Sequence, residues 1–360
     1  MSELLGGRSL DIFQPVRRQE ICSMVNVMLS KAKARVKVDI GAELMRLNNN
    51  VLSRIIMRER CSENEDEAGK VKTMIKEVSN VIGIFNLCDY IWFCKKWDLQ
   101  GIKRKLVGVR GRYDIMMDRI IHEHIDMRRK KKRKVHGDGA CTEKDLLDIL
   151  LDISEDKSME IRLSIENIKA FILDVFSAET DTTAILTEWA VAELINHPDI
   201  MQKAIEEINT VLHYYSDNQA KIVALQITIY PQTLDYLLIT WLLAETQSTG
   251  KVHLNLNQKR FLLSSEDQAS GKKQLDVKGW HFHFLPFGSG QRGCPGSSLA
   301  LHLVETSLAA IIQCFELEVG SEGDKSDATV DMEEAPRLTL PMAHPLVRTL
   351  VARLNPFSCM

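Results

Sequence analysis

The sequence predicts a mainly α-helical protein with small β regions. Apolar residues recur every three or four positions over long stretches, which is the spacing of one face of an α-helix. Helix-ending signals separate these stretches, and the clearest is the pair His197-Pro198. Near the C-terminus, Pro336, Pro341 and Pro345 divide the chain into short pieces. Those pieces predict a closing β region rather than a further helix.

The composition is that of an ordinary globular protein. The chain has 360 residues, of which 45% are hydrophobic and 26% charged, and its formal net charge is −3. This charge provides no global basic field for nucleic acid. The eight cysteines form no CxxC pair and no zinc-ligand spacing, so we expect free thiols in a reducing compartment. We expect no apolar run that crosses a bilayer, and the N-terminus does not resemble a signal peptide.

The first part of the chain predicts helices. Residues 17–50 carry Ile21, Val25 and Met28 at helical spacing, and residues 71–85 form a second helical pattern. The acidic stretch 61–69 between them predicts a surface loop. Residues 89–100 mix aromatic side chains with lysine, a pattern that also fits a corner of the core.

A long helix is predicted over residues 104–134, and it ends in seven consecutive basic residues, 128–134. Such a run invites a nuclear-localisation or nucleic-acid interpretation. We favour a solvated helix end, because the overall charge is close to neutral. Residues 145–153 predict a short amphipathic helix.

The longest predicted helix covers Ile165 to Asn196, with Ser164 as its N-cap. Pro198 starts another helix that runs through Val211. The middle of the long helix reads AETDTT, residues 178–183, and consecutive threonines predict a loosened turn there.

An acid beside an alcohol at such a turn suits oxygen chemistry. Thr182 is able to hold a hydrogen bond or a water, and Asp181 is able to relay protons from solvent. The alternative is a partly buried polar turn without a chemical role.

The stretch FLPFGSGQRGCPGSSLAL, residues 284–301, places Cys294 in a loop of Gly, Ser and Pro just before a predicted helix, 298–315. Loop N–H groups and the helix N-terminus favour a thiolate. A thiolate of this kind is a ligand for haem iron, and Arg292 is placed to pair with a haem propionate. The alternative is a buried structural cysteine in a turn.

The spacing Phe287-x-x-Gly290-x-Arg292-x-Cys294-x-Gly296 resembles the haem-binding loop of cytochrome P-450 enzymes. The segment AETDTT resembles the oxygen-activating helix of the same family. The text around both motifs, including EWAVAELINHP and LDVKG, is similar to the plant flavonoid group. That group includes flavone synthases, flavanone 2-hydroxylases and isoflavonoid hydroxylases.

The resemblance implies an incomplete cytochrome P-450 fold and a haem-dependent monooxygenase. One atom of O2 enters a flavanone-type substrate, with electrons from an NADPH-cytochrome reductase. Cys294 is then the iron ligand, while Phe287, Gly290, Arg292 and Gly296 complete the haem-binding loop. Phe287 shields the sulfur and Arg292 anchors a propionate.

The resemblance also assigns proton delivery to Asp181 and Thr182. It places residues 89–100 over the substrate pocket and towards the membrane. The family resides at the endoplasmic reticulum membrane, and for a chain without an anchor we expect a cytoplasmic or unknown location. No nucleic-acid partner is expected.

Three parts follow from the resemblance. Residues 1–211 are the helical part with the oxygen-activating helix, 164–196. Residues 212–259 do not resemble the family and are expected to be poorly ordered. Residues 260–360 hold the haem-binding loop, the helix after it and the β region. The start of the chain resembles a point inside a longer family member, so we expect an N-terminal truncation.

Residues 212–259 lack the Glu-x-x-Arg helix that the family has in this region. Shifted codons compatible with these residues permit the strings PLLLRQSSEDCSITDYDIPA and LAIGRDPKHWESPLEFKPE. The second string resembles the family's approach to its Pro-Glu-Arg-Phe turn. We therefore hypothesise a reading-frame disturbance here, preceded by a deletion. Ordinary divergence is the alternative.

Two further hypotheses compete with an active enzyme. One is a truncated, haem-free and catalytically silent product, favoured by the missing segments and by Glu179, where the family usually has a small residue. A buried carboxylate beside a haem is costly unless it is paired or protonated. The other is a haem-binding protein without turnover, which needs only the Cys294 loop.

Overall fold

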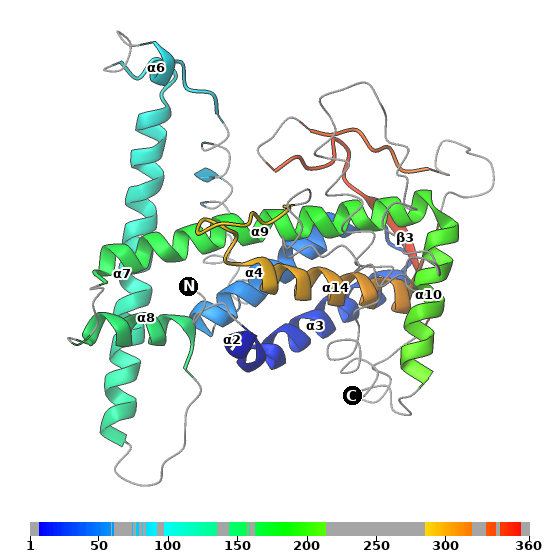
Figure 1. Ribbon diagram of the computed structural model, residues 1–360, viewed down its shortest axis with the longest axis horizontal. Coiled ribbons are helices and arrows are strands. Elements are labelled where there is room, and N and C mark those ends of the chain that lie inside the picture. The colour runs from blue at the N-terminus through cyan, green and yellow to red at the C-terminus, as the bar shows by residue number, and fades with distance from the viewer. Residues whose placement is uncertain are drawn as a thin grey trace. The chain divides into compact units, whose positions relative to one another are not determined.

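The structure is a computed structural model, and most of its elements are helices (Figure 1). It describes residues 7–58, 60, 74, 77, 78, 81, 84–91, 97–134, 144–156, 158, 163–213, 285–318, 329–335 and 339–353. The predicted mainly α class with small β regions is confirmed. The predictions for 61–69, for most of 71–85 and, within 212–259, for residues 214–259 fall outside the described residues. Residues 212 and 213 belong to a helix that ends at His213.

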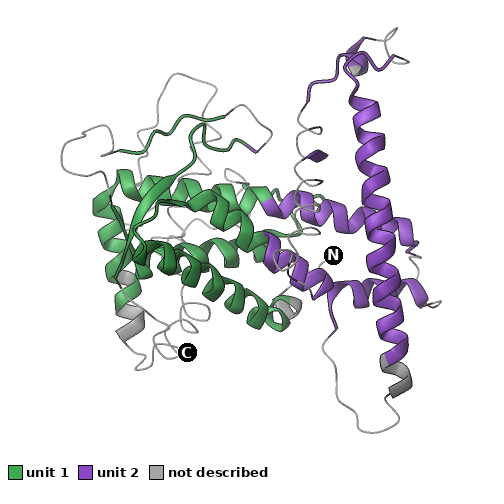
Figure 2. Ribbon diagram, turned by 180° about the vertical axis from the view of Figure 1, so that it is seen from behind, with its two compact units in different colours: residues 1–48, 181–335, 340–360 green, residues 49–180, 336–339 purple. Residues whose placement is uncertain are grey.

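The chain divides into two compact units (Figure 2). Unit 1 comprises residues 1–48, 181–335 and 340–360, and unit 2 comprises residues 49–180 and 336–339. Two helices, α4 (Ile40–Met57) and α9 (Ile165–Asn196), contribute residues to both units.

Unit 1 is built around α14 (Ser297–Cys314), which contacts α3 (Gln14–Lys33) and α10 (Pro198–His213). The short helix α2 (Gly7–Ile12) precedes α3. Most residues of α14 are buried, including a run of Leu, Val and Ile side chains. Each such side chain contributes about 1.5–3 kcal/mol when it is removed from water. This apolar helix is therefore the centre of the unit 1 core.

A three-stranded antiparallel sheet closes unit 1. Its strands are β1 (Val38–Asp39), β2 (Phe315–Glu318) and β3 (Val347–Ala352), in the order β1-β3-β2. Val38 pairs with Arg348 across the first interface, and Phe315 pairs with Ala352 across the second. The predicted closing β region is present, and its partner strands come from distant parts of the chain.

The C-terminal segment of unit 1 is held by side chains of α9. The carboxylate of Glu188 accepts the N–H of Leu346 at 3.1 Å, and the indole N–H of Trp189 donates to the carbonyl of Leu340 at 3.1 Å. The side chain of Asn196 exchanges two hydrogen bonds with the backbone of Val330. These bonds fix the segment along α9 without a regular ladder.

Unit 2 contains α6 (Leu87–Tyr90), α7 (Ile102–Lys134) and α8 (Leu146–Glu155). The predicted helix over 104–134 is confirmed, and its basic end lies within α7. There Arg128 is half-buried and forms ion pairs with Asp148 and Asp152 of α8. Part of the basic run therefore binds the protein itself.

One helix departs from the expectation of no membrane-length segment. Among the described residues, α14 is long and apolar enough to cross a bilayer by length and composition, and 67% of it is buried. An apolar core helix has the same properties, and its residues pack against α3 and α10. Its Gly-free, Leu-rich sequence explains why both criteria are met.

A Glu-x-x-Arg spacing that sequence reasoning missed lies in α4. Glu43 is buried and accepts hydrogen bonds from Lys31 Nζ at 2.7 Å and from Arg46 Nε at 3.0 Å. The contact between Lys31 and Glu43 joins α3 to α4 within unit 1, whereas Arg46 lies on α4 itself. It lies far before Cys294 in the chain, and the segment 212–293 contains no such spacing.

Candidate functional site

The Cys294 loop folds back on itself through three backbone hydrogen bonds. The N–H of Cys294 donates to the carbonyl of Phe287 at 2.7 Å, and that of Gly293 donates to Gly290 at 2.8 Å. The N–H of Gly288 donates to Leu285 at 3.1 Å. Gly288 has a φ of +74°, which favours glycine, so the loop needs this residue at its first turn.

Backbone hydrogen bonds of the loop and the start of α14 lie on either side of Cys294 in the chain. Three loop N–H groups, including that of Cys294 itself, donate to carbonyl oxygens. The N-terminus of α14 follows, with Gly296 as an N-cap that makes no side-chain hydrogen bond. The first N–H groups of the helix, which carry partial positive charge, begin three residues after Cys294.

Cys294 is the exposed cysteine among those that the described residues include. Cys22 is half-buried, and burial raises the pKa of its thiol. Cys314 is buried, and desolvation raises its pKa to about 12. Cys88 is buried and its thiol donates to the carbonyl of Trp97 at 2.8 Å. An accessible sulfur on a pinned loop suits a metal ligand, whereas buried thiols stay protonated and inert.

The other predicted loop residues surround this sulfur in the chain. Arg292 and Gly290 are exposed, whereas Phe287 and Gly296 are half-buried. A Cβ on Gly293 would lie 3.1 Å from the carbonyl of Gly290, so the loop is tight there. An exposed thiol, an exposed guanidinium and a loop lined by glycine fit a flat anionic macrocycle with an iron centre.

The acid–alcohol segment lies in a continuous part of α9. The expected loosened turn is wrong, because α9 runs unbroken from Ile165 to Asn196. Asp181 is half-buried and Thr182 is exposed, whereas Glu179 is buried. The hydroxyl of Thr180 donates a hydrogen bond to Asn49 Oδ1 at 3.2 Å. This threonine therefore binds α4 within unit 2.

Packing within unit 1 relates the two candidate segments. Leu186 of α9 and Val304 of α14 belong to one buried cluster, against which Leu301 also packs. Leu186 follows Thr182 by about one helical turn, and Leu301 lies about one turn after the start of the helix that follows Cys294. All seven predicted residues belong to unit 1. Asp181 and Thr182 lie on α9, and the other five lie in the loop that leads into α14, which packs against α9 through this cluster.

A second polar cluster was not predicted from the sequence. His124 of α7 lies 3.0 Å from Asp148 and 3.4 Å from Asp145, and Arg58 lies 3.1 Å from Asp145. Asp145 also caps α8 by accepting the N–H of Asp148 at 2.7 Å. Arg128 pairs with Asp148 and Asp152 beside them. Because acidic and basic side chains alternate here, we interpret this cluster as an ion-pair network.

Comparisons with known proteins identify relatives. Residues 1–228 and 258–342 match the model of the cytochrome P-450 family. Cytochrome P-450 93A2 of Glycine max is 40% identical over 392 aligned positions, covering 100% of this chain and 75% of the relative. The 3,9-dihydroxypterocarpan 6A-monooxygenase of Glycine max is 38% identical, with 99% and 74% covered.

A third relative, 2-hydroxyisoflavanone synthase of Glycyrrhiza uralensis, is 33% identical, with 98% of this chain and 72% of the relative covered. The crystal structure of a cytochrome P-450 (CYP102L1) superposes with a TM-score of 0.68 at 19% identity, covering 98% of this chain and 80% of that one. The last match concerns the fold alone.

Proposed function

This chain belongs to the cytochrome P-450 family, and we propose that it oxidises a flavanone-type flavonoid with electrons from an NADPH-cytochrome reductase. Membership makes it a haem-thiolate monooxygenase of the plant flavonoid group at family level. The relatives that are named for action on a dihydroxypterocarpan and for synthesis of a 2-hydroxyisoflavanone support the substrate class. The observation that carries the proposal is the exposed thiol of Cys294 on its pinned loop.

Cys294 would hold the iron of haem, the expected cofactor of this family. When bound, haem supplies an iron centre that uses O2, two electrons and two protons to place one oxygen atom in a C–H bond and release one water. Arg292 is exposed and would pair with a propionate. The carbonyl of Phe287 accepts the N–H of Cys294 and so holds the loop backbone. The ring of Phe287 is half-buried, and we propose that it limits access of water to the sulfur.

Asp181 and Thr182 would supply the protons. Asp181 is half-buried on α9, an environment that reaches both solvent and the protein interior. Thr182 is its exposed neighbour, and its hydroxyl is able both to accept and to donate a hydrogen bond. We propose that the carboxyl of Asp181 takes protons from solvent and that the Thr182 hydroxyl passes them on.

The first experiment tests haem ligation in the full-length chain. We expect the reduced, carbon-monoxide-bound difference spectrum to show the red-shifted Soret band of thiolate-ligated haem. Cys294→Ser should lose this band, because a neutral hydroxyl is a poor replacement for thiolate. Cys22→Ser is the matched control and should keep it. Absence of haem uptake by the unsubstituted chain would refute the enzyme and favour the catalytically silent alternative.

The second experiment tests the substrate and the proton path. With a reductase and NADPH, we expect a flavanone to gain one oxygen atom, measured by mass spectrometry with labelled O2. Asp181→Asn and Thr182→Ala should each lower kcat about 10²-fold while the haem spectrum stays unchanged. Turnover in both variants that matches that of the unsubstituted chain would contradict the proton path and leave Cys294 ligation untouched.

A further inference from the structure

Glu179 is a buried acid that the proposed proton path does not use. It lies on α9, three residues before Thr182, and only 8% of the residue is exposed. A carboxyl group is costly to bury unless it takes part in hydrogen bonds. The neighbours that the helix places around Glu179 therefore indicate what its carboxyl group can do.

Helical spacing gives Glu179 four close neighbours. In an unbroken α-helix, residues three and four positions apart lie next to each other, whereas successive residues do not face each other. Around Glu179 these positions hold two apolar residues and two threonines, namely Val175, Phe176, Thr182 and Thr183. Asp181 and Thr182 are successive residues. The acid that shares a face of α9 with Thr182 is therefore Glu179.

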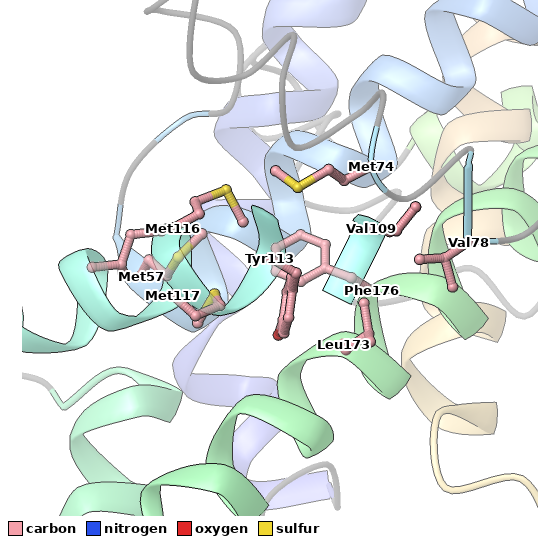
Figure 3. Close-up of a pocket in the computed structure, with 10 residues that line it drawn as sticks. Met57, Met74, Val78, Val109, Tyr113, Met116, Met117, Leu173 and Phe176 are labelled. Carbon is pink, nitrogen blue, oxygen red and sulfur yellow. The ribbon is translucent and has the colours of Figure 1, made fainter. Parts of the chain in front are cut away.

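The neighbours on the N-terminal side of Glu179 belong to an apolar environment. Phe176 is buried, and together with Leu173 it lines a small apolar pocket between α9 and α7. Figure 3 shows both side chains near Tyr113, whose hydroxyl donates to the carbonyl of Lys169 at 2.6 Å. Four methionines also belong to the wall, namely Met57, Met74, Met116 and Met117. A hydroxyl partner for Glu179 within α9 must therefore come from the C-terminal side.

Of the two threonines on the C-terminal side, Thr182 is the better placed. Thr183 is buried, and a threonine inside a helix commonly bonds back to the carbonyl four residues earlier, as Thr187 does to Thr183 at 2.9 Å. Thr182 is exposed instead. Its Cα–Cβ bond is tilted towards the N-terminus of α9, over the turn that holds Glu179.

The face of α9 that carries Thr182 continues towards the helix that follows the Cys294 loop. Leu186 lies about one turn after Thr182 and packs against Val304 of α14. That helix begins at Ser297, three residues after Cys294. A group that orients the Thr182 hydroxyl therefore acts on the side of α9 where the reaction is proposed to occur.

We propose that Glu179 is a positioning residue for the Thr182 hydroxyl. Its carboxyl group forms a hydrogen bond with that hydroxyl and fixes the direction in which the hydroxyl passes protons. The positioning role rests on the proposed function, because only a turning-over enzyme needs protons from Thr182. The hydrogen bond itself does not depend on haem and is tested first.

The first experiment detects this hydrogen bond by NMR in the haem-free, full-length chain. The glutamate carboxyl groups are labelled with ¹³C, and Glu179→Gln identifies the Glu179 signal. Thr182→Val removes the hydroxyl and should shift this signal. Thr187→Val makes the same change about two turns after Glu179 and should leave it in place. An unmoved signal in Thr182→Val, or a shift that follows Thr183→Val instead, would overturn the proposal.

The second experiment tests the positioning role with reductase, NADPH and a flavanone. Glu179→Leu should lower kcat about 10²-fold at unchanged KM, with the reduced, carbon-monoxide-bound spectrum unchanged. Glu179→Gln should restore most of the turnover, because an amide still donates and accepts hydrogen bonds. Adding Glu179→Leu to Thr182→Val should slow the enzyme no further, because both changes remove the same interaction.

Two results would overturn the positioning role. One is full turnover in Glu179→Leu, and the other is a Glu179→Gln variant as slow as Glu179→Leu. Absence of turnover in the unsubstituted chain would refute the proposed function and the positioning role with it. The carboxyl signal of Glu179 would still decide whether the hydrogen bond exists, so the two failures are distinguishable.

Discussion

Single residues in this protein are constrained by their nearest neighbours more than by their own preferences. Gly41 shows this, because a Cβ built there would lie 2.6 Å from the carboxyl group of Glu188. That carboxylate is buried and accepts the N–H of Leu346. Because Gly41 has no Cβ, Glu188 has room to hold the hydrogen bond that joins α9 to the C-terminal segment at Leu346.

Gly41→Ala should destabilise the protein by about 1–3 kcal/mol, because Glu188 must move and its hydrogen bond to Leu346 lengthens. The midpoint of urea unfolding measures the effect. Gly108→Ala on α7 is the control, since nothing lies within 4 Å of the added methyl group. Alanine there should be neutral or stabilise by up to about 1 kcal/mol. Equal shifts in both variants would contradict this account.

Glu188 should make stability depend on pH. Burial raises its pKa, and the backbone bond to Leu346 offsets only part of this effect. A carboxyl with a raised pKa in the folded state contributes stability that is complete below its unfolded pKa, about 4.3, and is lost as pH rises through the folded value. Glu188→Gln should therefore gain stability relative to the unsubstituted chain as pH rises.

Unfolding midpoints between pH 4 and 8, about the working range of these groups, test this prediction. The control is Glu123→Gln, which makes the same substitution at an exposed position of α7. If the difference in unfolding midpoint between Glu188→Gln and the unsubstituted chain did not change with pH, burial of Glu188 would be excluded as a cause of pH-dependent stability.

At the scale of elements, helix ends are where sequence and tertiary contacts meet. The hydroxyl of Ser164 accepts the N–H of Asn167 at 3.2 Å, which supports the predicted start of α9. The middle of α9 differs from the prediction, because the helix is continuous where a loosened turn was expected. The Thr187 hydroxyl bonds back to the Thr183 carbonyl at 2.9 Å, so that threonine satisfies itself without unwinding the helix.

The start of α8 depends on its neighbour α7. His124 lies between Asp145 and Asp148, and its hydrogen bond to Asp145 is the main cause of its raised pKa. The same cluster also contains four other charged residues, namely Arg58, Arg128, Lys144 and Asp152. The imidazole of His124 therefore joins the N-cap of α8 to α7.

A raised histidine pKa contributes stability that is complete below about 6.5 and is lost as pH rises through the folded-state value. His124→Gln should therefore cost most at acidic pH, and the cost should shrink as pH rises. Unfolding midpoints across this range measure it, with the exposed His122→Gln as control. A cost that grows with pH would contradict the ion-pair interpretation.

For the whole molecule, the interrupted region remains a prediction of the sequence. The family model leaves residues 229–257 unmatched, and the alignment with cytochrome P-450 93A2 is longer than the 360-residue chain. The relative therefore holds residues that this chain lacks. Residues 214–259 themselves lie outside the described part of the structure.

Sequencing the transcript tests the frame disturbance. We expect the message for residues 212–259 to encode a family-like run in one alternate frame, including the approach to a Pro-Glu-Arg-Phe turn. Restoring that frame should improve haem uptake, measured by the same difference spectrum. A message without such a run in any frame would leave ordinary divergence as the explanation.

The sequence by itself determined the helical class, the bounds of α9 and the family. Periodicity, caps and the Cys294 motif are local signals, carried by residues close together in the chain. Only the tertiary structure decided that Val38 pairs with Arg348, that His124 joins α7 to α8, and that four methionines line one pocket. These arrangements need residues from distant segments to meet. Burial and pairing across such distances leave no local pattern, because each partner alone resembles an ordinary core or surface residue.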